Sequence, residues 1–386
     1  MPTARKARMM ADAMDRGAGA AVFENALESH PWEGRRNVLD LDDFARAEIE
    51  AVFETADRMK EVLARPIPRV PALRGRSIVN LFYEASTRTR VSFEAAAKSL
   101  GADVTNVTAT GSSVEKGETL LDTVRTLQAL GATALVVRHP HSGAPYTVAR
   151  HTGLPVINAG DGTHAHPTQA LLDAYTMREQ FGRVHGLRVL IVGDIAHSRV
   201  ARSDAWCLTT LGAEVTLSGP PTLLPPTCTS SQALTPTLSQ RDRGQPSADR
   251  ASLAPAWPVQ VDFDLDHAIC SADVVMPLRV QLERQEGNRL SSLREYARDY
   301  GITSLRMAQA PSRAVVMHPG PMNEGVEIDA DVAHGPRSMV QAQVAHGVAI
   351  RMAVLYLLIA ATSRARDGAH IPLSAAARPT TQSILV

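Results

Sequence analysis

Short β-branched segments alternate with helix-patterned segments along most of this chain of 386 residues. Residues 77–82 form one apolar run, a helix-patterned stretch follows to about residue 100, and residues 103–107 form the next run. Strands joined in this way by helices are usually parallel neighbours, and their crossovers are right-handed. The alternation therefore predicts an α/β fold built on parallel sheets.

The alternation occurs in two series, which predicts two doubly wound parallel-sheet domains that meet near residues 181–186. Strands are predicted at residues 77–82, 103–107, 134–137, 155–158, 188–193, 214–217, 274–276 and 314–317. Helices are predicted within residues 42–64, 86–100, 119–130, 167–181, 198–211, 293–300 and 338–361. The last of these helices is expected to cross back onto the first domain.

Domain limits follow from these patterns. The first domain is predicted to comprise residues 36–183 plus 338–363, and the second residues 184–337. Residues 1–35 have weak periodicity and are expected to form an N-terminal extension, and residues 364–386 a loose tail. Because 8 of the 24 prolines lie between Gly219 and Pro258, among Ser and Thr, we expect a flexible insertion at about residues 227–257.

Composition excludes several classes of protein. The 40 Lys and Arg balance 40 Asp and Glu, which argues against binding nucleic acid through bulk positive charge. Three scattered cysteines predict no disulfide framework and fit the reducing cytoplasm. The N-terminus has no long apolar core of a secretory signal, and the best apolar stretch, residues 344–361, is interrupted by His346 and Arg351, so we expect no membrane span.

The segment Ser86-Thr87-Arg88-Thr89-Arg90 follows a predicted strand and opens a predicted helix. A helix N-terminus offers unpaired N–H groups and a positive dipole, hydroxyls add donors, and arginine can clamp a phosphate. The segment therefore predicts a phosphate site built without a glycine-rich loop. The alternative is a simple helix cap with solvent-exposed arginines. Neither a P-loop nor a G-x-G-x-x-G motif is present, so a nucleotide fold is poorly supported.

Further polar clusters follow other predicted strands. Arg138-His139-Pro140 follows residues 134–137, and the segment from His164 to Gln169 follows residues 155–158. Ligands of open α/β sheets bind outside the carboxyl ends of the strands, where these clusters would converge. His164 and His166 lack an acidic or Cys partner at zinc-like spacing, so no metal is expected. Ser112 and Lys116 lie in a polar loop, and Lys116 is one of only four lysines.

Together these segments resemble one known family, the aspartate carbamoyltransferase catalytic chains. The similarity covers roughly residues 37–226 and 258–362. The motifs that carry it are residues 82–94 (FYEASTRTRVSFE), Lys116-Gly117-Glu118-Thr119, Arg138-His139-Pro140, Asn158-Ala159-Gly160-Asp161-Gly162, His166-Pro167-Thr168-Gln169, Arg279-Val280-Gln281 and His318-Pro319-Gly320-Pro321. The resemblance implies transfer of a carbamoyl group from carbamoyl phosphate to L-aspartate in pyrimidine biosynthesis, without a metal or organic cofactor.

The resemblance also implies roles for individual residues. Those expected to bind carbamoyl phosphate are Ser86, Thr87, Arg88, Thr89, Ser112, Arg138, His166, Gln169, Pro319 and Gly320. Those expected to bind aspartate are Lys116, Arg199, Arg279 and Gln281. Arg88, Thr89, Arg138, His166 and Lys116 are the expected catalytic residues, with Thr89, Arg138 and His166 polarising the carbonyl oxygen. Glu84 is expected to close the domains by pairing with Arg199 and Arg284.

In the family, the residues that match Ser112 and Lys116 reach into a neighbouring subunit's site, which implies a homotrimer with shared active sites. The resemblance also allows a higher assembly with dihydroorotase or a regulatory chain. Two alternatives stay open. The first is an ornithine carbamoyltransferase, although that family has His-Cys-Leu-Pro where this chain has His318-Pro319-Gly320-Pro321. The second is a catalytically silent scaffold, although every residue carried over is present.

Overall fold

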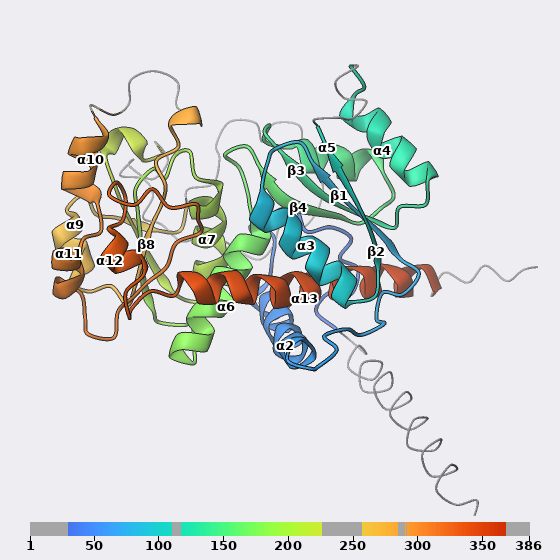
Figure 1. Ribbon diagram of the computed structural model, residues 1–386, viewed down its shortest axis with the longest axis horizontal. Coiled ribbons are helices and arrows are strands. Elements are labelled where there is room, and N and C mark those ends of the chain that lie inside the picture. The colour runs from blue at the N-terminus through green and yellow to red at the C-terminus, as the bar shows by residue number, and fades with distance from the viewer. Residues whose placement is uncertain (1–29, 110–116, 226–256, 285–289, 291, 368–386) are drawn as a thin grey trace, which may run out of the picture.

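The computed structural model describes residues 30–109, 117–225, 257–284, 290 and 292–367 (Figure 1). Within these residues the chain forms two parallel sheets with helices against them. This confirms the predicted fold of two α/β domains. The predicted insertion and tail, apart from their edges, and residues 1–29 lie outside the described residues.

The first domain contains a four-stranded parallel sheet in the order β2-β1-β3-β4. Its strands are β1 (Ser77–Phe82), β2 (Asp103–Thr108), β3 (Ala134–His139) and β4 (Val156–Asp161). Its helices are α2 (Arg46–Leu63), α3 (Thr87–Ser99), α4 (Leu120–Ala129), α5 (Ala144–His151) and α6 (Pro167–Phe181). All four strands were predicted, with ends differing by up to three residues.

The second domain contains a five-stranded parallel sheet in the order β7-β6-β5-β8-β9. Its strands are β5 (Arg188–Val192), β6 (Glu214–Ser218), β7 (Gln260–Val261), β8 (Val274–Pro277) and β9 (Val315–Val316). Its helices are α7 (Arg199–Thr210), α9 (Leu265–Ile269), α10 (Leu293–Tyr300), α11 (Ser304–Gln309) and α12 (Ala330–Ala333), with short 3-10 turns at Pro221–Leu223 and Leu282–Arg284.

Apolar side chains cover both faces of each sheet, as a doubly wound fold requires. On the first sheet, Ile78 and Val136 face one core, while Val79 and Leu135 face another formed with Val124 and Val148 of helices α4 and α5. The alternation follows from the strand period of two, which places successive side chains on opposite faces. The strands are therefore fixed in register by burial on both sides.

Helix α13 (Val340–Asp367) returns from the second domain and packs against α2, α3 and α6 of the first (Figure 1). The predicted crossing back is thus confirmed. Within the described residues, the segment Val340–Ala360 is the one helix long and apolar enough to span a membrane, with mean hydropathy 1.6. In this fold most of that helix is buried, because its apolar side chains belong to the main hydrophobic core.

Three boundaries differ from the sequence analysis. Trp32, assigned to the N-terminal extension, is 1% exposed, stacks edge-on against Phe44 and donates its ring N–H to Glu48 O at 2.8 Å. The packed chain therefore begins before residue 36. Trp257, at the edge of the predicted insertion, packs against the core, and α13 extends to Asp367 rather than ending near residue 361.

Several short elements were not predicted from the sequence, namely α5, α9, α11, α12 and β7. Each has between two and eight residues, too few to show a clear hydrophobic period. The sequence of helix α5 did carry a helix-start signal, because Gly143 at its N-cap is followed by Pro145 in its first turn.

Candidate active site

A cavity of about 770 Å³ lies between the two domains. It is lined by segments that follow the carboxyl ends of β1, β3, β5, β8 and β9, as parallel sheets favour. Every predicted site residue that the structure describes lines this cavity. They are Glu84, Ser86, Thr87, Arg88, Thr89, Arg138, His166, Gln169, Arg199, Arg279, Gln281, Arg284, Pro319 and Gly320.

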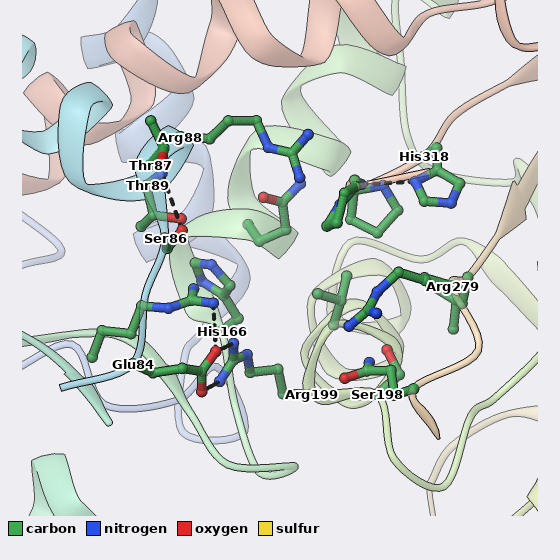
Figure 2. Close-up of a pocket in the computed structure, with 18 of the residues that line it drawn as sticks. Glu84, Ser86, Thr87, Arg88, Thr89, His166, Ser198, Arg199, Arg279 and His318 are labelled. Carbon is green, nitrogen blue, oxygen red and sulfur yellow. Dashed lines mark hydrogen bonds and ion pairs between the residues drawn. The ribbon is translucent and has the colours of Figure 1, made fainter. Parts of the chain in front are cut away.

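The N-terminus of helix α3 faces one side of the cavity, while Arg279 and Ser198 face it from the second domain (Figure 2). Ser86 caps this helix, since its hydroxyl accepts a hydrogen bond from Thr89 N at 3.4 Å. The cap uses one Ser86 lone pair and leaves helix N–H groups directed at the cavity. The local sequence thus makes both the helix start and an anion site.

Arg88 projects from the first turn of α3 toward the loop at Gly320. Burial alone lowers the pKa of its guanidinium, because no carboxylate among the described residues pairs with it. Gly320 has φ 66°, and a Cβ built there would lie 2.4 Å from Arg88 Nη1. Glycine is required here both for the left-handed backbone and for the close approach of Arg88.

Glu84 joins the two domains through three arginines. Its carboxylate accepts hydrogen bonds from Arg138 Nη2 at 2.7 Å, from Arg199 Nη1 at 2.9 Å and from Arg284 Nη2 at 3.4 Å. Burial acts to raise the pKa of Glu84, but the Arg199 hydrogen bond and the three positive charges outweigh it, so the pKa lies below its ordinary value of 4.5. Since Arg138 belongs to β3 and Arg199 to α7, the ionised carboxylate holds both sides of the cavity together (Figure 2).

Arg138 and His166 form the floor between these groups. Arg138 Nη1 donates to Ala159 O at 3.1 Å, and burial, with the charge of Arg199, lowers the pKa of Arg138 to about 9. His166 donates its backbone N–H to Ser203 Oγ at 2.9 Å. Burial and the nearby arginines lower the pKa of its imidazole well below 6.5. His166 is therefore neutral near pH 7, and a neutral imidazole can donate one ring N–H to a substrate oxygen.

The wall from the second domain is formed by residues 278–284, which follow strand β8. Arg279 forms an ion pair with Glu283, and Gln281 N donates to Asp194 Oδ2 at 3.0 Å. Asp194 also pairs with His197 Nδ1 at 2.6 Å. These contacts fix the backbone of the segment while leaving the Arg279 side chain 27% exposed.

His164, the other histidine considered as a metal ligand, faces a different cavity. Its ring lies 3.3 Å from Asp161 Oδ2 and 3.5 Å from Asp40 Oδ2, and the Asp161 hydrogen bond raises the pKa of the imidazole. Within the described ranges no three His, Cys, Asp or Glu side chains are grouped to hold a metal ion. His164 is therefore an ion-pair partner of these two aspartates.

Comparison with known proteins agrees with this geometry. Residues 36–179 match the family profile "Aspartate/ornithine carbamoyltransferase, carbamoyl-P binding domain", and residues 185–358 match "Aspartate/ornithine carbamoyltransferase, Asp/Orn binding domain". The chain belongs to the aspartate/ornithine carbamoyltransferase family. The two matches meet near the boundary between the two sheets, so each profile corresponds to one domain of the fold.

Individual relatives narrow the assignment within the carbamoyltransferase family. The chain is 55% identical over 325 residues to the aspartate carbamoyltransferase catalytic subunit of Chloroflexus aggregans, which covers 84% of this chain and 98% of that protein. Aspartate transcarbamoylase from Trypanosoma cruzi, solved with carbamoyl phosphate and aspartate, has TM-score 0.70 and 29% identity, covering 86% and 97% of the two chains. Ornithine carbamoyltransferase from Pyrococcus furiosus has TM-score 0.71 and 27% identity, covering 84% and 97%. The fold alone therefore does not distinguish the two activities.

Two residues expected from the carbamoyltransferase resemblance, Ser112 and Lys116, lie outside the described residues. Other residues that line the cavity were given no role from the sequence, although Ser92 and His318 lie within the quoted motifs: Ser92, Ser198, His318, Gln343 and Arg351. Arg351 donates to Ser92 Oγ at 2.9 Å and to Gly347 O at 3.0 Å. A signal for it was present, because a lone arginine within an apolar helix is costly to bury unless it has a role at a polar site.

Proposed function

We propose that this chain is an aspartate carbamoyltransferase catalytic subunit, which transfers the carbamoyl group of carbamoyl phosphate to L-aspartate in pyrimidine biosynthesis. The main support from the structure is the charge of the cavity. Arg199, Arg279 and Arg284 line it from the second domain, opposite the N-terminus of α3. Two carboxylates of an aspartate and one phosphate need such cationic partners. The names of the relatives at 53–56% identity agree with this choice.

Carbamoyl phosphate would bind with its phosphate at the start of α3. The hydroxyls of Ser86, Thr87 and Thr89 would donate to phosphate oxygens, and Arg88 and Arg138 would neutralise their charge. Arg88 is suited to this role because it has no carboxylate partner of its own among the described residues. The phosphate group would supply the counter-charge that this guanidinium lacks.

The reaction is attack of the aspartate amine on the carbonyl carbon. A C–N bond forms, and the carbonyl oxygen gains negative charge in a tetrahedral intermediate. The C–O bond to phosphate then breaks, and the amine proton passes to the departing phosphate. Thr89, Arg138 and neutral His166 would stabilise the oxygen by donating hydrogen bonds. Gln169 and the carbonyl groups of Pro319 and Gly320 would accept hydrogen bonds from the carbamoyl NH₂. Positioning and charge stabilisation then account for most of the rate.

Aspartate would bind against Arg199, Arg279 and Gln281. Glu84, together with Arg138, Arg199 and Arg284, is called the Glu84 clamp below. It holds Arg199 and Arg284 of the second domain over the phosphate side, so it supports a closed arrangement of the domains. Ornithine fits this wall less well. Among the described residues, the carboxylates that line the cavity are Glu84 and Glu283, and both are outnumbered by the arginines beside them, so these residues offer no free anionic partner to its second amino group.

A transfer assay tests the proposal. Purified protein is mixed with carbamoyl phosphate and either L-aspartate or L-ornithine, and the ureido product is measured. Product with aspartate alone supports the proposal. Product with ornithine alone would replace the acceptor and keep the phosphate site, and no product with either would indicate a catalytically silent homologue.

We also propose, from the family resemblance, that Ser112 and Lys116 act in a neighbouring subunit's site and that the active unit is a homotrimer. Mixing is a direct test. Lys116→Ala and Arg88→Ala proteins should each be inactive, whereas refolding them together should restore activity because some sites would combine two intact halves. If mixed assemblies shown to have the mass of a trimer recover no activity, the proposal that neighbouring subunits share active sites is contradicted.

A further inference from the structure

Asp173 on helix α6 is a buried carboxylate behind the cavity rather than in its wall. Its side chain is fully buried and accepts hydrogen bonds from Gln169 Nε2 at 3.0 and 3.2 Å and from Gln343 Nε2 at 2.7 Å. Both glutamines line the cavity, and Asp173 does not. Asp173 therefore contacts two cavity residues from outside, one on its own helix and one on α13.

An ionised carboxylate can only accept hydrogen bonds, so it determines the orientation of each amide that faces it. Gln169 and Gln343 must both present their NH₂ groups to Asp173, and their carbonyl oxygens must point elsewhere. Gln343 Oε1 accepts from His318 N at 2.9 Å. Gln169 Oε1 is thereby left as the acceptor that this side chain offers to the cavity.

The same contacts extend to the loop after β9. His318 Nδ1 accepts from Gly320 N at 2.7 Å, so the neutral ring carries its proton on Nε2, which lies 3.3 Å from Glu327 Oε1. Burial lowers the pKa of His318, which keeps the ring neutral. The backbone of Pro319 and Gly320 is thus held by a chain of contacts that runs from Asp173 through Gln343 to His318.

We propose that Asp173 is a positioning residue that makes the cavity selective for an acyl donor carrying an NH₂ group. It acts by turning the Gln169 carbonyl oxygen into the cavity and by holding, through Gln343, the loop that supplies two further acceptors. This inference rests on the proposed function and extends it to a residue that does not touch the substrate.

A role in stability does not account for this carboxylate. Burial raises the pKa of Asp173 to about 7, although the Gln343 and Gln169 hydrogen bonds and the charge of Arg351 oppose the shift. A group whose pKa is raised by folding weakens the fold as pH rises above its unfolded value, because the ionised form is less stable in place. Asparagine, with the same shape and no charge, would avoid this penalty. The carboxylate therefore lowers the stability of the fold. What it provides, and asparagine does not, is a side chain that can only accept hydrogen bonds.

The test compares two donors that share a leaving group. Carbamoyl phosphate and acetyl phosphate differ in that a methyl group replaces the NH₂, so acetyl phosphate gains nothing from correctly turned acceptors. The ratio of their kcat/KM values is measured for wild type and Asp173→Asn at about pH 8.5, above the raised pKa of the Asp173 carboxyl. In the variant the new amide can donate to Gln169 Oε1, so the Gln169 amide can turn over. Its NH₂ would then face the substrate NH₂, and two donors cannot form a hydrogen bond.

The expected result for Asp173→Asn is a loss of about 10- to 100-fold in kcat/KM with carbamoyl phosphate and little change with acetyl phosphate. Asp273→Asn is the control. Asp273 is also a buried carboxylate that accepts hydrogen bonds, from Arg188 N at 3.0 Å and Arg313 Nε at 3.0 Å, but it does not line the cavity. Its substitution should leave the ratio unchanged. A purely structural role would lower kcat/KM for both donors together. A ratio equal to that of wild type in Asp173→Asn would overturn the proposal.

A double-mutant cycle guards against misfolding. Gln169→Leu removes the acceptor itself, so adding Asp173→Asn to it should cost much less than in wild type if Asp173 acts mainly through Gln169. Should Asp173→Asn fail to fold, Gln343→Met is used instead, because it removes only the contact between Asp173 and the His318 loop. It should lower the ratio of kcat/KM for carbamoyl phosphate to that for acetyl phosphate. An unchanged ratio would overturn the proposal that Asp173 acts through this loop. A wild-type protein inactive with both donors would overturn the proposed function and this assignment with it.

Discussion

The two sides of the cavity are held in different ways. On the carbamoyl-phosphate side, Arg138, His166 and Gln169 each have a contact to a buried group, and the Arg138 side chain is 10% exposed. On the aspartate side, Arg279 pairs with Glu283, whose side chain is 52% exposed. Buried pairs fix geometry, whereas exposed pairs exchange readily with solvent and ligands. The first side is therefore organised before substrate arrives, and the second can rearrange around it.

This difference has a physical reason. The phosphate side is built on strand ends and helix N-termini, where the backbone itself supplies donors and fixed positions. Apart from Arg199 at the start of α7, the aspartate side is built on residues 278–284, a segment whose one regular element is a 3-10 turn. Substitutions on the first side should therefore damage turnover, while substitutions on the second should adjust the affinity for aspartate.

Arg88→Ala should give the largest effect. Loss of this guanidinium should lower kcat/KM for carbamoyl phosphate by at least about 10²-fold, because it removes charge stabilisation of the departing phosphate. Steady-state kinetics measure this. Arg90→Ala is the control, since Arg90 lies on the same helix and does not line the cavity. A near-normal rate for Arg88→Ala would contradict the preorganised phosphate side.

Glu84→Gln should come next. The neutral amide cannot balance Arg138, Arg199 and Arg284, and hydrogen bonds to charged groups are worth about 1.5–3 kcal/mol each, so kcat should fall by about 10- to 100-fold. The melting temperature near pH 7 should fall only by the stabilisation that the ionised carboxylate gives, because both domain cores are untouched. Glu94→Gln on the exposed face of α3 is the control. Wild-type kinetics from a folded Glu84→Gln protein would refute the clamp.

The Glu84 carboxylate, with its three arginines, should also make the stability of the fold depend on pH. Its pKa is lowered in the folded protein, so the stabilisation it gives is fully present above its ordinary value of 4.5 and is lost as pH falls through the lower folded value. A plot of the melting temperature against pH should therefore fall more steeply below pH 4.5 for wild type than for Glu84→Gln. Parallel curves would show that folding does not lower the pKa of Glu84.

Gly320→Ala should have an intermediate effect. The left-handed backbone at φ 66° and the 2.4 Å approach to Arg88 both oppose a Cβ, so KM for carbamoyl phosphate should rise by about 10-fold. Gly325→Ala separates the two causes, because Gly325 has φ 81° but a Cβ added there would meet nothing within 4 Å. An equal rise in both variants would mean that backbone strain, rather than Arg88, is responsible.

Glu283→Gln should have the smallest effect and the opposite sign. It releases Arg279 from an exposed pair worth about 0–1 kcal/mol, so KM for aspartate should fall by up to about 5-fold. The kcat/KM for carbamoyl phosphate should not move. A rise in the KM for aspartate would mean that Glu283 positions Arg279 for substrate instead of competing with it.

Local features of the site could be predicted from the sequence, and distant pairings could not. The Ser86 cap and the anion site on α3 follow from five adjacent residues. Glu84 and Arg284 are 200 positions apart, and their pairing was expected through the family resemblance, not from spacing. The contact of Asp173 with Gln343 spans 170 positions and left no signal, because it depends on how α13 returns to α6. Trp32 was missed because too few residues surround it to show a period.

The return of α13 also concerns the order in which the chain is made. The strands and most helices of the first domain lie within the first half of the chain. However, α2, α3 and α6 bury their apolar faces on a helix that begins at Val340. A nascent chain that has emerged only as far as the second domain still exposes those faces. The first domain to be synthesised is thus the last to be completed, and until then it presents an apolar groove to chaperones and to other chains.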